Sequence, residues 1–108
     1  MAALSIQERK RLRQIGHALN PVVMVGSHGL TENVIEETNR ALNDHELIKV
    51  KVAGEDREAR AAVIDALVEA TGAESVQNIG KIVLLYKKAA KQNQHLSNLV
   101  RFAHLSNN

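Results

Sequence analysis

The chain has 108 residues, 44% hydrophobic and 24% charged, which is enough for one domain with a single core and too little for two. It contains no cysteine, which excludes disulfides, thiolate metal ligands and cysteine nucleophiles. The longest apolar run is about five residues, far below a membrane span of about 20 residues, and no secretory signal is visible, so we expect a cytoplasmic protein.

The net charge is only +2, but the charges are separated along the sequence. Residues 32–74 hold 11 acidic and 5 basic side chains, whereas residues 1–31 and 75–108 together hold 9 basic and 1 acidic. A basic patch that binds nucleic acid would give this pattern. Ordinary solvated surface would give it too, because separation in sequence need not mean separation in space. Aromatic residues make up only 2%, so binding could not rest on rows of stacking rings.

The first expected helix runs from Ser5 to about Ala18. Ser5 followed three residues later by Glu8 forms a capping box, which marks a helix start. One edge of this helix is apolar, and it consists of Leu12, Ile15 and Leu19. Another edge carries four basic side chains, which we call the basic stripe: Arg9, Lys10, Arg13 and His17. The stripe has no acidic partner at i+3 or i+4, which favours contact with a ligand, although such a stripe can also serve only to keep a helix soluble.

A glycine motif follows the first strand. Val22–Val25 is apolar throughout, which predicts a strand buried on both faces. Gly26-Ser27-His28-Gly29, the glycine loop, comes next, and Thr31 can cap a second helix that extends to about Asp44. Such a junction points backbone N–H groups and a helix dipole at one spot, which suits a phosphate. A plain strand–helix turn has the same pattern, so the motif alone is weak.

The glycine loop does not match the glycine motifs of enzymes. It has neither the spacing nor the lysine of a P-loop, and a dinucleotide fingerprint needs a third glycine. A nucleophile elbow needs glycine two residues before Ser27, where Val25 stands. His28 is badly placed as a base for Ser27, and the five histidines form no His-x-x-x-His pair. We therefore predict no catalytic residue, no metal site and no cofactor.

The middle of the chain predicts a strand and a third helix. In Leu47–Val52 three β-branched residues alternate with Lys49 and Lys51, so the lysines should point outward, either as solvated surface or as a positive pair that contacts a nucleic-acid backbone. The helix should run from about Arg57 to Thr71 and end at Gly72. Its expected apolar face comprises Ala59, Ala62, Val63, Ala66, Leu67 and Ala70.

The end of the domain predicts a hairpin. Strands near Ser75–Ile79 and Ile82–Tyr86 are separated by the short Gly80-Lys81 turn, which favours antiparallel pairing. The element order is α-β-α-β-α-β-β, which predicts an α/β fold with a four-stranded mixed sheet packed by helices. We assign residues 1–88 to one domain and 89–108 to a tail. Helically spaced apolar residues allow a short helix in the tail, but we favour a frayed end.

The sequence resembles single-domain bacterial members of the CRM-domain family, the YhbY-like proteins, over about Leu4 to Tyr86. The resemblance rests on several linked motifs in matching order: Gly16-His17-Ala18-Leu19-Asn20-Pro21-Val22-Val23, Gly26-Ser27-His28-Gly29-Leu30-Thr31, His45-Glu46-Leu47-Ile48-Lys49-Val50-Lys51, Asp56-Arg57-Glu58, Thr71-Gly72-Ala73 and Val76-Gln77-x-Ile79-Gly80-Lys81. It implies a fold similar to the C-terminal domain of a bacterial translation initiation factor. It also implies an RNA-binding protein that assists assembly of the large (50S) ribosomal subunit on its precursor particles.

The expected function is therefore RNA binding without enzymatic activity, by a monomer whose partner is rRNA and which has no membrane association. The family's pattern assigns backbone contact to the glycine loop as in KH domains. The expected RNA-contacting residues are Gly26, Ser27, His28, Gly29, Arg9, Lys10, Arg13, His17, Lys49 and Lys51. The alternative is a protein-interaction module that reaches the ribosome through a protein partner.

Overall fold

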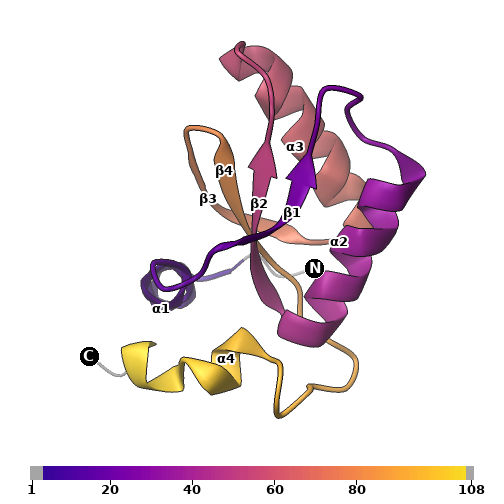
Figure 1. Ribbon diagram of the computed structural model, residues 1–108. Helices are drawn as coiled ribbons and strands as arrows, with labels where there is room; N and C mark the ends of the chain where they lie inside the picture. The colour runs from indigo at the N-terminus through magenta and orange to yellow at the C-terminus, as the bar shows by residue number, and fades with distance from the viewer. Residues whose placement is uncertain (1–3, 107–108) are drawn as a thin grey trace.

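A computed structural model describes residues 4–106 and shows helices packed on both faces of one sheet (Figure 1). The elements in chain order are α1 (Ile6–Gly16), β1 (Pro21–Val25), α2 (Glu32–His45), β2 (Leu47–Val52), α3 (Arg57–Thr71), β3 (Glu74–Ile79), β4 (Ile82–Tyr86), α4 (Asn98–Arg101) and the 3-10 helix η1 (Ala103–Ser106). The predicted α-β-α-β-α-β-β order is confirmed, and two short helices follow it. Among the described residues no helix is both long and apolar enough to pass through a bilayer.

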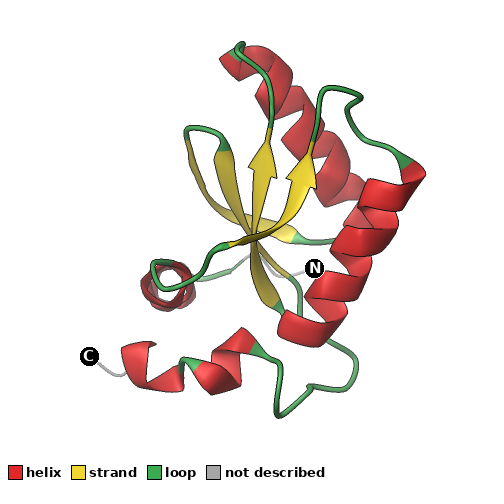
Figure 2. Cartoon of the chain, viewed as in Figure 1, coloured by secondary structure: helices red, strands yellow, loops and turns green. Residues whose placement is uncertain are grey.

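The sheet has the order β1-β2-β4-β3 and is mixed, as predicted. β1 pairs in parallel with β2, whereas β2–β4 and β4–β3 are antiparallel. Helices α2 and α3 cover one face over a core of Val, Ile and Leu side chains (Figure 2). Helix α1 covers part of the other face through a smaller cluster formed by Leu12, Ile15, Leu47, Val76 and Leu84.

Local signals place the starts of the three long helices and the end of α3 where the sequence predicted them, whereas α1 ends at Gly16, before the expected Ala18. The Ser5 hydroxyl accepts a hydrogen bond from the Glu8 N–H, and the Glu8 carboxylate accepts one from the Ser5 N–H, which completes the capping box. Thr31 caps α2 and Asp56 caps α3. Helix α3 ends at Gly72, whose φ of +74° is a left-handed conformation that glycine adopts without penalty.

The expectation that β1 is buried on both faces is wrong. Val23 and Val25 lie in the core, but Val22 is 54% and Met24 64% exposed. β1 is an edge strand, and α1 covers the second face only near the other end of the sheet. An apolar run in the sequence is compatible with burial on both faces but does not supply the layer that would cover the second one.

The predicted apolar face of α3 is also wrong in part. Leu67 and Val63 face the core, but the four alanines in the predicted face are exposed, and Ile64, Val68 and Thr71 take their places. The helix is rotated toward its larger side chains because burial of a branched side chain removes more apolar surface from water than burial of alanine does.

The tail is not frayed, contrary to our expectation, because a buried carboxylate holds it. Glu46 is 2% exposed, and its carboxylate accepts hydrogen bonds from the Ala89 N–H (2.9 Å), the Gln92 side-chain amide (2.6 Å) and the Ser97 hydroxyl (2.8 Å). Asn98 then donates to the Leu47 carbonyl at 2.7 Å. These bonds lead the chain back beneath the sheet, where η1 packs against α1 (Figure 1).

Candidate nucleic-acid interface

The glycine loop is a tight turn whose backbone is uncovered. The Gly29 N–H donates to the Gly26 carbonyl at 3.0 Å, and Gly29 has a φ of +75°. A Cβ atom added at either glycine would meet nothing within 4 Å. Ser27 and His28 between them are exposed, and neither has a hydrogen-bond partner among the described residues. The loop therefore presents its main chain and two donor-capable side chains to a ligand.

The helix that follows offers less to an anion than the sequence suggested. The Thr31 hydroxyl already accepts the Val34 N–H at 3.2 Å, which satisfies one of the free N–H groups of the first turn. Glu32 adds a negative charge in the same turn. The helix also begins three residues after Gly29. Any phosphate at the loop would thus meet the turn's backbone rather than the end of α2.

The basic stripe of α1 is not uniformly free, which corrects our reading of it. Arg9 is half-buried, forms an ion pair with Glu74 (3.6 Å) and donates to the Ser75 carbonyl at 3.0 Å. These contacts fasten α1 to β3. Lys10 and His17 are exposed, and Arg13 is half-buried.

The stripe and the glycine loop lie at opposite ends of β1. The loop follows the tip of β1 at the top of the view, whereas α1 lies at the lower left (Figure 1). Between them lies a part of the sheet that α1 leaves uncovered, which we call the open sheet face. Lys49 and Lys51 of β2 belong to this face, and Met24 of β1 pairs with Lys51.

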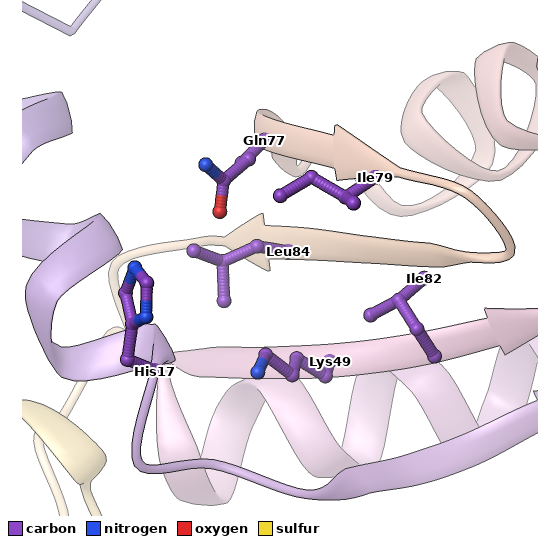
Figure 3. Close-up of a pocket in the computed structure, with 6 residues that line it drawn as sticks. All are labelled: His17, Lys49, Gln77, Ile79, Ile82 and Leu84. Atoms are coloured by element: carbon purple, nitrogen blue, oxygen red, sulfur yellow. The ribbon is translucent and has the colours of Figure 1, made fainter.

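Strand register arranges the open sheet face in two rows. In one row Met24 is followed by Lys51, Ile82 and Ile79 on successive strands. In the other, Lys49 lies beside Leu84, and Leu84 lies beside Gln77. A groove of about 210 Å³ opens here, bounded at one end by α1 (Figure 3). It is lined by His17, Lys49, Gln77, Ile79, Ile82 and Leu84.

The sequence reasoning missed four of these groove residues. Ile82 and Leu84 were expected only as strand residues, and Gln77 and Ile79 also as part of a family motif, but none of the four as a site residue. Polarity could not have singled out Gln77, because Glu74, Ser75 and Asn78 on the same strand are polar too. The described residues contain no group of three His, Asp or Glu side chains placed to hold a metal ion.

Comparison with known proteins gives consistent matches over nearly the whole chain. A Pseudomonas aeruginosa protein named "Probable RNA-binding protein" is 50% identical over 101 residues, 94% of this chain and 97% of its own length. A Haemophilus influenzae protein named "RNA-binding protein" is 53% identical over 87 residues, 81% of this chain and 88% of its own.

The fold has a solved counterpart as well. The solution structure of a Staphylococcus aureus hypothetical protein proposed to bind RNA superposes with a TM-score of 0.73 at 30% identity, covering 88% of this chain and 98% of that one. The model of the CRS1/YhbY (CRM) domain matches residues 4–87, from the residue before the Ser5 cap to the first residue after β4. The chain therefore belongs to the CRS1/YhbY (CRM) domain family.

Proposed function

We propose that this protein binds RNA through the glycine loop and the open sheet face, and that it assists assembly of the large ribosomal subunit on rRNA precursors. The observation that carries the proposal is the uncovered loop backbone at one end of a sheet face that presents Lys49 and Lys51. The names of the relatives support RNA as the ligand. The ribosomal role follows the resemblance to YhbY-like proteins.

The chemistry of binding divides between the two parts. At the loop, the absence of side chains at Gly26 and Gly29 lets a phosphate approach the main chain. Along the sheet and α1, exposed cations supply sequence-independent attraction, and each phosphate contact steepens the salt dependence of binding. Lys10, His17 and Lys51 are exposed for this purpose.

The test of the loop uses Gly26→Asp. Gly26 has no positive φ and no neighbour within 4 Å, so the variant adds a negative charge without strain. We expect binding of an rRNA fragment to weaken at least about ten-fold, because the new carboxylate repels the phosphate. Gly26→Ala adds a side chain at the same position without the charge. Ala62→Asp is the control for charge, because it adds a carboxylate at an exposed position of α3, on the other face of the sheet.

Fluorescence anisotropy at low salt provides the measurement. If Gly26→Asp binds as tightly as the parent, the loop does not contact RNA. If the parent itself does not bind naked RNA, RNA binding is refuted and the protein-partner alternative takes its place. The exposed apolar side chains Val22, Met24 and Ile79 are the observation that favours that alternative.

The ribosomal role is tested separately by sedimentation of cell extracts. We expect the parent protein to co-sediment with particles lighter than the mature large subunit, and Gly26→Asp to remain at the top of the gradient. If the purified parent protein binds naked RNA but the parent in cell extracts is found only at the top of the gradient, the assembly role alone is refuted.

A further inference from the structure

The groove on the open sheet face combines an apolar floor with a polar rim. Ile82 of β4 and Ile79 of β3 supply its exposed apolar surface, with the nearly buried Leu84 beside them, and Gln77, His17 and Lys49 form the polar rim (Figure 3). The side chains point toward a shared space in this view. No carboxylate lines the groove, and Lys49 supplies a positive charge at its rim.

A β-bulge places Gln77 in this groove. Pairing between β3 and β4 shifts register between Ser75 and Gln77, so that Val76 packs against Leu84 in the α1 cluster and Gln77, the next residue, lines the groove beside Leu84. In a regular strand these two neighbours would point to opposite faces. Arg9 holds the bulge, donating to the Ser75 carbonyl at 3.0 Å.

The Gln77 amide has no hydrogen-bond partner among the described residues, although the side chain is half-buried. A half-buried amide beside an apolar floor favours a ligand that offers both a flat apolar face and polar edge groups, since such a ligand satisfies the amide and covers the floor. A nucleobase has both properties. A cavity of about 150 Å³ holds benzene, so the groove's 210 Å³ has room for one base.

Resting on the RNA binding proposed above, we propose that this groove holds one unpaired nucleobase of the bound RNA. The base lies on Ile82 and Ile79, the Gln77 amide hydrogen-bonds its edge, and the His17 ring stacks on it. The ammonium group of Lys49, whose stem runs along the groove, meets the adjoining phosphate. The groove thereby reads a base, and the glycine loop holds the backbone.

The ammonium group of Lys49 and the unpaired Gln77 amide favour a nucleotide over an apolar peptide side chain as the occupant. Lys49 lines the groove beside Leu84, and Lys51 pairs with Ile82 on the neighbouring row of the same face. An apolar peptide side chain would leave these charges and the Gln77 amide without partners, whereas a nucleotide supplies acceptors for both.

The experiment measures binding of the full chain to equal-length rA, rC and rU oligomers and to one RNA duplex, with 2-aminopurine fluorescence reporting on base burial. The parent should prefer single strands, discriminate among them and change the 2-aminopurine signal. Gln77→Leu should reduce discrimination about ten-fold while keeping overall binding. Gln7→Leu, at an exposed position of α1 outside the groove, is the matched control and should behave as the parent.

Three further variants, two at His17 and one at Lys49, keep the test independent of β3 folding, because they lie at the end of α1 and on β2. His17→Ala should weaken binding to single strands about 5- to 100-fold through lost stacking, and His17→Phe should restore it. Lys49→Gln should weaken binding to all the oligomers alike, and it should lower the slope of log affinity against log salt concentration by about one.

The outcomes separate the two proposals. A parent that binds no RNA refutes the proposed function and the base site with it. A parent that binds RNA, but whose discrimination and 2-aminopurine signal are unchanged in Gln77→Leu and whose affinity is the same for His17→Ala and His17→Phe, refutes the base site alone. Equal affinity for duplex and single strands also refutes it.

Discussion

Replacing Glu46 should release the tail and destabilise the whole domain. This residue is buried at the C-cap of α2, its carboxylate accepts three hydrogen bonds from the tail, and its carbonyl accepts the Lys87 N–H at 2.9 Å. Glu46→Ala removes the acceptor for all three tail donors. It leaves the Ala89 N–H and the Ser97 O–H, both of them buried, without an acceptor.

The magnitude follows from these contacts. Each hydrogen bond to a charged group contributes about 1.5–3 kcal/mol, but the three are not additive because a loosened tail lets some donors reach water. We expect Glu46→Ala to lower the free energy of unfolding by about 3–5 kcal/mol, which is a large part of the 5–15 kcal/mol typical of a domain.

The backbone at Glu46 provides an internal comparison. Its φ of +63° is the only positive value among the described non-glycine residues, and such a conformation costs a residue with a Cβ roughly 1–3 kcal/mol. Glu46→Gly loses the same carboxylate but relieves that strain. It should therefore be less destabilised than Glu46→Ala by about 1 kcal/mol or more.

Urea unfolding followed by circular dichroism measures both differences, and hydrogen exchange of residues 89–105 shows whether the tail is released. Glu36→Ala, at an exposed position of α2, removes a carboxylate of the same kind and should change stability by less than about 0.5 kcal/mol. A Glu46→Ala protein with the parent's urea midpoint and the parent's exchange protection over the tail would show that the reasoning is wrong.

Further predictions concern pH and close packing. Burial alone raises the pKa of Glu46, but hydrogen bonds from Ala89, Gln92 and Ser97 outweigh burial and hold the pKa below its ordinary 4.5. The contribution of Glu46 to the free energy of unfolding is therefore complete above about pH 4.5, and it is lost as the pH falls through the lowered pKa. When the free energy of unfolding is measured at decreasing pH, it should fall less steeply for Glu46→Gln than for the parent protein. Gly16→Ala brings a Cβ to 2.7 Å from Leu84 and should cost about 1–3 kcal/mol in urea unfolding, whereas no loss would mean that Leu84 moves freely. Arg9→Gln should lower the melting temperature, since it removes the Glu74 ion pair and the bond that holds the β3 bulge. If Arg9→Gln instead weakened RNA binding with unchanged stability, Arg9 would be an RNA contact after all.

Local sequence was sufficient for the elements and their order. Ser5, Thr31 and Asp56 cap the helices because the N–H groups of a helix's first turn lack an intrahelical acceptor and a short polar side chain can reach them. Gly72 ends α3 because it adopts a positive φ. These effects act within a few residues, so they can be read without knowing the fold. The short Gly80-Lys81 turn fixed the hairpin for the same reason.

Tertiary structure decided what each face of these elements meets. Whether Met24 is buried depends on how far α1 extends over the sheet, and whether Arg9 is free depends on Glu74, 65 positions away. The tail is ordered because Glu46 is buried where residues 89–98 can reach it. Periodicity shows which side chains can share a face, but only the assembled layers determine which faces are covered. The open sheet face exists because α1 covers only part of its side of the sheet.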